Sequence, residues 1–436
     1  MKKKSWTVMV YLAGDNNLDS AGVTDLDEMK KVGSTAALNI VAQFDRAAAG
    51  QTTRRYFLKK GGLLEADAVA NLGETNTGDP RILTDFVKWA VKDYPAERYL
   101  LVVWNHGNGW DDTDVYRLAR GSVGANITRR GTMVARASEN NGTDVSLRRI
   151  RVIAGGKFRR SLFRTSVESA VRTRGIAYDD NAQDFLDNLE LKRVLLAAKK
   201  SIGRNIDVLG LDACLMSMAE VGYENRVAAD FTVGSEQTEP GDGWPYDTIL
   251  ADLARNPKMT ARNLARTIVK RYLASYAANA GVTQAACDLA QSGSLLNAVN
   301  GLATALRDAL ANPLARAGII ESRAQVQTYE TQDYIDLRDF CELLQTNCAG
   351  EKAITAAVKP VLVAIKKYVV ASGSKGSAME NSHGVSIHFP NDPRQALSPL
   401  YAKLDWARDG SWDEFLRAWL GSLRNRSGRA LRRDTN

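Results

Sequence analysis

Short runs of apolar and β-branched residues alternate with amphipathic stretches in the first 256 residues, and this alternation most limits how the chain folds. We predict strands from these runs, at residues 6–13, 38–44, 54–60, 99–105, 206–212 and 230–236. The stretch after Asp79 is typical of a helix, because Asp is a favoured N-cap residue and Pro80 fits the first helical turn. Residues 190–201 and 216–230 are further helix candidates. Strands that alternate with helices indicate βαβ units, so we expect an α/β fold with a mostly parallel sheet.

The chain becomes helix-rich after residue 257. Helical patterns cover residues 260–280, 294–312, 334–347 and 353–372, and two shorter apolar runs at 284–290 and 383–390 are typical of strands. We therefore predict a first domain at 1–256 and a helix-rich C-terminal region at 257–436 that packs on it. The basic tail at 423–436 is expected to be frayed.

Composition favours a soluble protein of a reducing compartment. With 436 residues, 44% of them hydrophobic, the chain is long enough to bury a large core. Its four cysteines form no CxxC pair and show no dense spacing, which indicates free thiols rather than a disulfide framework. The start MKKKSWTVMVYLAGDNN imitates a signal peptide, but its short apolar run passes into AGDNN without a cleavage site, which favours a first core strand. No apolar run approaches the roughly 20 residues of a membrane span, and we expect a cytoplasmic location.

The positive charge is concentrated in one segment. The whole chain has a net charge of +8, whereas residues 115–174 alone contain fourteen Lys and Arg against three acids. Because this region has no sustained hydrophobic period, we predict an exposed, flexible insertion at about 111–178. Basic segments often bind nucleic acid or anionic surfaces. The segment has few aromatic side chains for stacking on bases (Tyr116, Phe158 and Phe163), which makes a nucleic-acid interface the weaker interpretation.

His106 and Cys214 are the strongest candidates for chemistry. His106 directly follows the predicted strand that ends in VVWN, and Cys214 lies just beyond the one that ends in GLD. In an open parallel sheet the reactive crevice lies outside the carboxyl ends of the strands, so both side chains are expected at one rim, as a thiol nucleophile and its base require. The alternatives are a cysteine packed in the core and a histidine that only forms a turn. The other histidines, His383 and His388, lie in a predicted strand and are expected to support the sheet.

Neighbouring residues fit the same chemistry. The amide of Gly107 could donate to the oxyanion of acyl transfer. The sequence after Cys214 predicts a helix whose N-terminus would stabilise a thiolate. In an extended chain Asp212 and Cys214 lie on the same face. We therefore expect Asp212 at the base of a pocket that binds a cationic side chain. The alternative is that Asp212 is the N-cap of the following helix. Asp242, in PGDGW, suits the same pocket or an ordinary turn.

Five motifs occur in the chain in this order: WTVMVYLAGDNNLD, VVWNHGNGW, DVLGLDACLMSMAEVGYE, VGSEQTEPGDGWPYD and HGVSIHFP. As a set they resemble the clostripain family of cysteine peptidases over most of residues 5–395, the basic insertion excepted. The resemblance implies a caspase-like fold, which is a mostly parallel sheet with helices on both faces. It also implies that His106 is the catalytic histidine and Cys214 the nucleophile. Asp212 would be the acid of a pocket for Arg or Lys, and Asp242 a second pocket acid.

The resemblance also bears on maturation and cofactors. Members of the family are often made as inactive single chains that are cut between the histidine and cysteine motifs. Some depend on calcium and others do not, whereas the Cys–His chemistry needs no metal, so we expect no cofactor to be required for the reaction. An enzyme that cuts after arginine finds an internal substrate in the insertion, and we predict self-cleavage within 115–174. The alternative is a solvated loop that is never cut.

Other functions remain open at this point. One is a peptidase of the same fold that cleaves after a neutral residue, and another is a non-enzymatic binder of nucleic acid or an anionic surface through residues 115–174. An inactive relative is disfavoured because both candidate catalytic residues are present. We expect peptide or protein substrates with Arg or Lys, no membrane contact and no nucleic-acid partner.

Overall fold

The computed structural model describes residues 3–111, 176–179, 181–182 and 184–433. Of the insertion predicted at about 111–178, residues 112–175 lie outside the described residues, and so does the predicted cleavage at 115–174; residues 176–178 form part of a strand. The chain divides into two compact units. The first contains Met1–Gly203 and Glu239–Lys258, and the second contains Arg204–Thr238 and Met259–Asn436.

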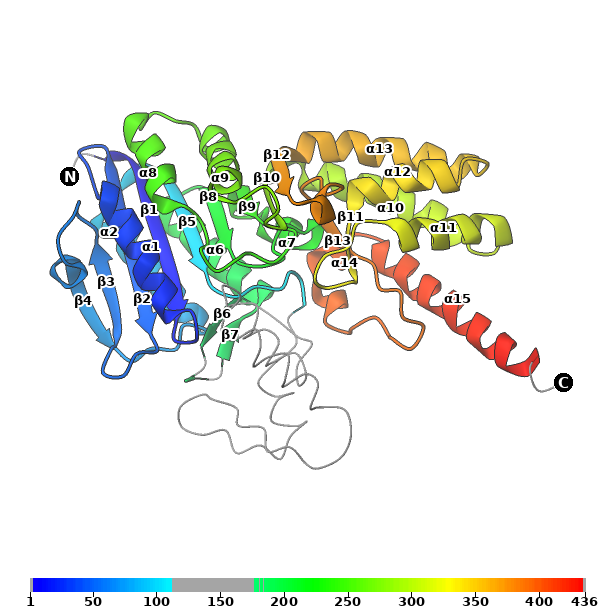
Figure 1. Ribbon diagram of the computed structural model, residues 1–436, viewed down its shortest axis with the longest axis horizontal. Helices are drawn as coiled ribbons and strands as arrows, with labels where there is room; N and C mark the ends of the chain where they lie inside the picture. Colours follow the sequence, from blue (N-terminus) through cyan, green and yellow to red (C-terminus); the bar gives the residue numbers. More distant parts are fainter. Residues whose placement is uncertain (1–2, 112–175, 180, 183, 434–436) are drawn as a thin grey trace, which may run out of the picture. The chain divides into compact units, whose positions relative to one another are not determined.

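The first unit is a sheet with helices on both faces (Figure 1). Its elements, in chain order, are β1 Lys4–Gly14, α1 Asp19–Val32, β2 Leu38–Arg46, β3 Thr53–Phe57, η1 Leu64–Asp67, β4 Ala68–Gly73, α2 Pro80–Asp93, β5 Ala96–Trp104, β6 Ile176–Asp179, β7 Asp184–Leu186, α6 Asn188–Ile202 and α8 Tyr246–Arg255. The strand order is β5-β1-β2-β3-β4. β1 pairs in parallel with both β2 and β5, whereas β3 and β4 join as antiparallel strands at the edge.

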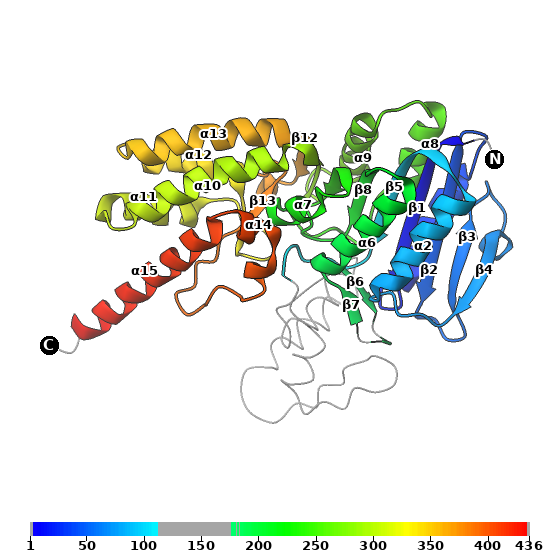
Figure 2. The ribbon, with the colours of Figure 1, turned by 180° about the vertical axis from the view of Figure 1, so that it is seen from behind.

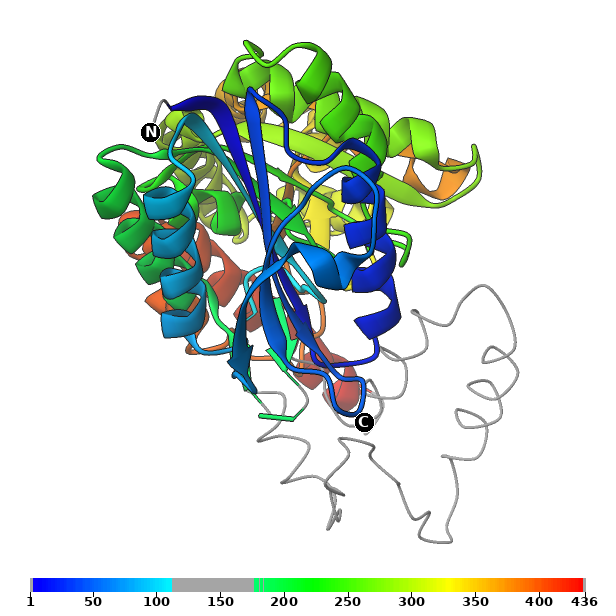
Figure 3. The same cartoon turned by 90° about the vertical axis from the view of Figure 1, so that its left-hand side faces the viewer.

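Helices α1 and α8 cover one face of this sheet, and α2 and α6 cover the other (Figures 2 and 3). Every residue of β1 from Trp6 to Gly14 is buried, as expected for a central strand covered on both faces. Helix α2 begins as predicted: the Asp79 carboxylate accepts a hydrogen bond from the amide of Arg81, and Pro80 occupies the first turn.

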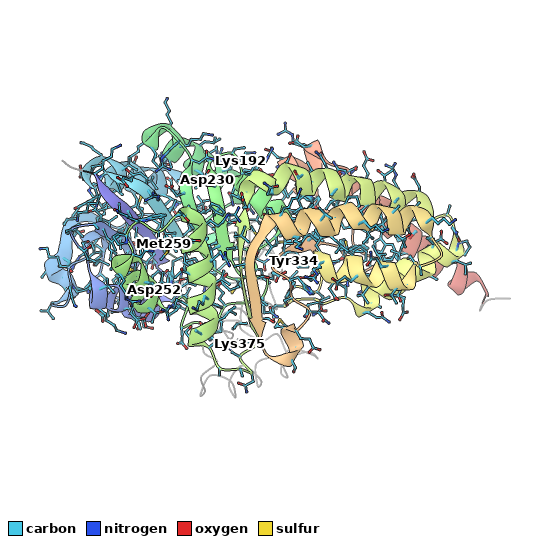
Figure 4. The ribbon with its side chains drawn as sticks, turned by 90° about the horizontal axis from the view of Figure 1, so that it is seen from above. Lys192, Asp230, Asp252, Met259, Tyr334 and Lys375 are labelled. Atoms are coloured by element: carbon cyan, nitrogen blue, oxygen red, sulfur yellow. The ribbon has the colours of Figure 1, made fainter. Side chains whose placement is uncertain are left out.

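The second unit combines a smaller group of strands with a helical layer. Its elements are β8 Ile206–Asp212, α7 Ala219–Asn225, β9 Ala229–Gly234, α9 Ala261–Ser275, β10 Val282–Asp288, η2 Leu289–Gln291, α10 Ser292–Ala309, α11 Pro313–Gln325, β11 Tyr334–Asp336, α12 Leu337–Asn347, α13 Lys352–Tyr368, β12 Val369–Lys375, η3 Ser377–Met379, β13 Ser386–His388, η4 Tyr401–Lys403, α14 Asp405–Asp409 and α15 Trp412–Arg433. The strand order is β12-β10-β9-β8. β8 and β9 are parallel, and β10 and β12 are antiparallel. Figure 4 labels Lys375 at the end of the edge strand β12.

The α/β prediction with a mostly parallel sheet is confirmed, and several local expectations are corrected. The helix predicted at 216–230 is only the short α7, which begins at Ala219. Residues 423–433 of the basic tail belong to the last part of α15, and the expected fraying of the tail stays a prediction. β13, which contains His388, pairs with β11 in a separate two-stranded sheet rather than with the larger set of strands. No described helix has both the length and the hydropathy of a membrane span.

Candidate active site

His106 lies in the first unit, two residues after the end of β5, in a loop held by buried asparagines. The side-chain amide of Asn105 donates to the carbonyl of Ala13, and its oxygen accepts the amide of His106. Asn16 donates to the same carbonyl at 3.0 Å. Because β1 and β5 are adjacent parallel strands, these contacts join the two carboxyl ends and fix the backbone from which His106 projects.

The His106 ring is oriented by Asn17. Its Nε2 lies 2.8 Å from the amide oxygen of Asn17, in the loop between β1 and α1. With that oxygen as acceptor, Nε2 carries the proton in the neutral ring and Nδ1 is the basic nitrogen. A ring fixed in this tautomer and orientation is what a general base requires.

Gly107 continues the same loop and is half-buried. The loop is fixed at its far end, where Asn188 at the start of α6 donates to the carbonyl of Gly109 at 3.0 Å. Gly109 adopts a φ of 70°, a conformation that favours glycine. The glycines of the NHGNG sequence therefore build a tight, anchored loop beside His106.

Cys214 lies in the second unit, in a turn directly after β8. The turn is closed by two backbone hydrogen bonds to the segment after β9, from Leu215 to the carbonyl of Gln237 at 3.2 Å and from Ser217 to that of Ser235 at 2.9 Å. Leu215 has a φ of 64°, unusual for a residue other than glycine, and its side chain is fully buried. The buried Leu215 side chain anchors a strained backbone next to the cysteine, and strain of this kind is often found at functional sites.

The four cysteines fall into two classes. Cys287, Cys341 and Cys348 are buried, and burial raises the pKa of the Cys287 thiol to about 12 and that of Cys348 to about 11. Burial also raises the pKa of Cys341. Cys214 is half-buried and is the one cysteine of the four that is not buried. Of the sequence alternatives for Cys214, a thiol sealed in the core is therefore wrong.

Two expectations about the surroundings of Cys214 are also wrong. The residues that follow it form a turn rather than a helix, because α7 begins only at Ala219. A helix N-terminus therefore does not stabilise its thiolate. For the same reason Asp212 is not an N-cap, since the residue that precedes α7 is Met218. Asp212 is the last residue of β8 and is 4% exposed.

Asp242 belongs to the first unit and lies in an exposed turn. The amide of Gly243 donates to the carbonyl of Pro240 at 3.0 Å, and Gly243 has a φ of 55°. Directly after this turn, Trp244 is buried and the amide of Tyr246 donates to Glu28 on α1. The turn chemistry predicted for PGDG is present, and the role of Asp242 in a pocket stays a prediction.

The remaining histidines hold the fold of the second unit. His383 makes two hydrogen bonds to Asp336, from its amide at 2.6 Å and through Nδ1 at 3.1 Å. His388 is buried in β13, and its amide donates to Glu220 at 2.9 Å. Both are therefore structural, and His106 is the candidate catalytic histidine.

The structure thus places the predicted residues in two groups. His106, Gly107 and Asp242 belong to the first unit, and Asp212 and Cys214 to the second. Sequence reasoning gave no role to Asn17, although AGDNNLD stood among the recognised motifs. The available signal was an asparagine pair directly after a predicted central strand, at the same sheet edge as His106.

Comparison with known proteins identifies the family. The profile of the clostripain family (Peptidase C11) matches residues 10–122 and 164–419, which is most of the chain. The chain belongs to the clostripain family. It is a clostripain-like cysteine peptidase, and the resemblance stated from the sequence motifs is confirmed.

Individual relatives of this clostripain-family chain are distant. Clostripain from Hathewaya histolytica is 22% identical over 528 residues, which cover 98% of this chain and 89% of the relative. A secreted C11 cysteine protease from Bacteroides thetaiotaomicron, solved with an irreversible peptide inhibitor, has a TM-score of 0.59 at 20% identity and covers 94% of this chain and 100% of that one. An inactive zymogen C11 protease from Parabacteroides distasonis has a TM-score of 0.61 at 19% identity, with 94% and 99% covered. These structures show that the fold is shared.

Proposed function

We propose that this family member is an endopeptidase that cleaves after Arg or Lys, with Cys214 as nucleophile and His106 as base. The observation that carries the proposal is the contrast among the cysteines: Cys214 alone is not buried, and it lies in an anchored turn at the carboxyl end of a buried strand. His106 occupies the corresponding position after β5, with Asn17 on its ring. The family membership favours this enzymatic function over the non-enzymatic binder.

In the proposed reaction the thiol of Cys214 gives its proton to His106, and the sulfur attacks the carbonyl carbon of the scissile bond. The amide of Gly107 donates to the oxyanion that forms. The C–N bond then breaks as His106 returns the proton to the leaving amine, which leaves a thioester on Cys214. Water attacks this thioester with His106 as base, and the carboxylic acid product and the free thiol are released.

For specificity we propose Asp212 as the acid that pairs with the substrate's Arg or Lys. It is two residues from Cys214 and nearly buried at the end of β8, where a carboxylate gains most from a cationic partner. Asp242 is the alternative or second acid.

The test compares Asp212→Asn with Asp242→Asn, which remove one charge each without a change of size. Fluorogenic peptides that end in Arg, Lys or Asn at the cleaved position report kcat/KM. We expect Asp212→Asn to lower kcat/KM for the Arg peptide by roughly 100-fold or more and to leave the Asn peptide unaffected. A wild type that prefers the Asn peptide would contradict the proposal and support cleavage after a neutral residue.

We further propose that the enzyme cuts itself within residues 115–174, where fourteen cationic side chains offer bonds of the preferred kind. Purified wild type and Cys214→Ala proteins are incubated without added protease and followed by mass spectrometry. The wild type is expected to yield two fragments and the variant to stay a single chain. Self-processing would be contradicted if the wild type and the Cys214→Ala variant both stayed uncut, or if both were cut to the same extent.

Two further properties stay proposals. Calcium is a possible requirement by family membership, although no step of the reaction above uses it. We propose a location inside the cell because the four cysteines form no CxxC pair and show no dense disulfide spacing, whereas the Bacteroides thetaiotaomicron relative is described as secreted. Fractionation of cells that express the protein at its natural level tests the location.

A further inference from the structure

Three carboxylates converge at the carboxyl edge of the sheet in the first unit. Asp15 directly follows β1, Asp45 lies near the end of β2, and Glu74 directly follows β4. One oxygen atom from each lies within 4.8 Å of the others. Asp15 is 1% exposed and Asp45 is completely buried, while Glu74 is exposed.

The two buried carboxylates are only half satisfied by protein groups. Oδ1 of Asp15 accepts from Asn181 at 2.8 Å, and Oδ1 of Asp45 accepts from Thr53 at 2.6 Å. Oδ2 of Asp15 and Oδ2 of Asp45 are buried without a hydrogen-bond partner. A buried carboxylate oxygen without a partner is costly, and a cation bound between these oxygens would remove that cost.

The cationic side chain next to Asp45 in the sequence pairs with another acid. Arg46 follows Asp45 directly, but its guanidinium makes two hydrogen bonds of 2.9 Å to Asp19 on α1. Asp179, which is also buried, adds a further negative charge next to the group. The group therefore brings several carboxyl groups together in a small volume.

We propose that Asp15, Asp45 and Glu74 bind one hard divalent cation, with Ca²⁺ as the preferred ion. An all-oxygen set of three carboxylates is the chemistry that Ca²⁺ and Mg²⁺ select, and Ca²⁺ tolerates irregular geometry better. The hydroxyls of Thr53 and Thr75, 2.8 Å apart beside Asp45, are neutral oxygens of the kind that complete such a site.

The site is linked to the proposed catalytic histidine by a short stretch of chain. Asp15, Asn16 and Asn17 are consecutive, and Asn17 contacts the ring of His106 at 2.8 Å. A cation that fixes Asp15 therefore also fixes Asn17, and through it His106. This regulatory consequence rests on the proposed function, whereas cation binding does not.

Binding is tested on the full-length Cys214→Ala protein, which does not process itself under the proposal above. After EDTA treatment and dialysis, CaCl₂ is titrated in by calorimetry, with MgCl₂ as the comparison. We expect one site, and a dissociation constant raised about tenfold or more in Glu74→Gln, since even outer-shell partners contribute that much. Glu65→Gln is the matched control, because Glu65 is an exposed acid of the same unit outside the group.

Thermal unfolding distinguishes a group of acids that binds a cation from one that only supports the fold. In EDTA, Asp45→Asn is expected to melt at or above the temperature of its parent, because it relieves repulsion. With CaCl₂ the parent gains stability that grows with the logarithm of the ligand concentration, and Asp45→Asn does not. Hydrogen exchange within residues 14–18 is expected to slow when Ca²⁺ is added.

Absence of both heat and a melting shift in the parent at millimolar CaCl₂ would overturn the proposal, since the acids would then share protons alone. Equal weakening by Glu74→Gln and Glu65→Gln would place any binding elsewhere. Unchanged exchange at 14–18 despite binding would overturn the link to His106. Peptidase activity is not a readout in these experiments, so their failure is distinct from failure of the proposed function.

Discussion

At the scale of single residues, a small number of asparagine side chains hold the proposed catalytic histidine in place. His106 receives its orientation from Asn17, and the loop that carries it is tied to β1 through Asn105 and Asn16. None of these asparagines has reactive chemistry of its own. They are positioning residues, and their effect must therefore appear in turnover rather than in substrate binding.

Asn17→Ala is expected to lower kcat by up to about 100-fold with little change in KM, because a misoriented base loses most of its advantage. The pH profile of kcat should shift as well, since the tautomer of His106 is no longer fixed. Steady-state kinetics with the Arg peptide measure both. Asn71→Ala, an exposed asparagine of the same unit, is the control, and an equal loss in both variants would contradict the positioning role.

A second prediction for a single residue concerns His388. Its burial, with a smaller contribution from Arg323, lowers its pKa to about 3, whereas the unfolded chain binds a proton near pH 6.5. Because the folded pKa is the lower one, the stability tied to neutral His388 is present above pH 6.5 and is lost as the pH falls towards 3. The free energy of unfolding of His388→Gln, measured by urea denaturation, should approach that of the wild type on acidification, by up to about 1.4 kcal/mol per pH unit. A constant difference from pH 7 to pH 4 would show that the pKa of His388 is not lowered in the folded state.

At the scale of elements, the turn after β8 places the proposed nucleophile. Leu215 combines a φ of 64° with a completely buried side chain, so packing holds a backbone conformation that leucine disfavours. Glycine at this position loses the packing but accepts the backbone, whereas alanine loses most of the packing and keeps the strain.

Leu215→Gly is therefore expected to unfold with a free energy about 1 kcal/mol higher than that of Leu215→Ala, and both are expected to be less stable than the wild type. Within helices and strands, alanine is usually more stabilising than glycine, so the expected order is the reverse of the usual one. Urea denaturation of the three proteins on a Cys214→Ala background measures it. An alanine variant more stable than the glycine variant would contradict a strained turn.

The elements also show what the sequence pattern could and could not predict. The strand containing Asp212 was predicted with the bounds observed, because an unbroken apolar run between polar residues marks a buried strand. The helix predicted after Cys214 failed because residues 215–217 are held by hydrogen bonds to Gln237 and Ser235, and such tertiary contacts leave no local pattern. α11, at Pro313–Gln325, was missed because its buried stripe contains Gly318, Ser322 and Arg323, so its apolar pattern is weak.

At the scale of the whole molecule, function-bearing groups come from distant parts of the sequence. Parallel strands bring their carboxyl ends to one edge within each unit, which is why His106 and Cys214 could be proposed from strand ends alone. The group of Asp15, Asp45 and Glu74 could not be predicted in this way, since these residues are about thirty positions apart and no recognisable metal-binding motif surrounds them. It becomes visible only when the register of β1 with β2 sets Ala13 opposite Asp45.

The account rests on Cys214 as the single reactive thiol of an arginine-directed peptidase. The most direct test is to treat the intact protein with a peptide that carries Arg and a thiol-reactive ketone, then map the adduct by mass spectrometry. We predict one adduct, on Cys214, complete loss of hydrolysis, and no adduct in Cys214→Ala or on the buried thiols Cys287, Cys341 and Cys348. Inactivation by an adduct on another residue, or hydrolysis of the Arg peptide by Cys214→Ala at the wild-type rate, would contradict the account.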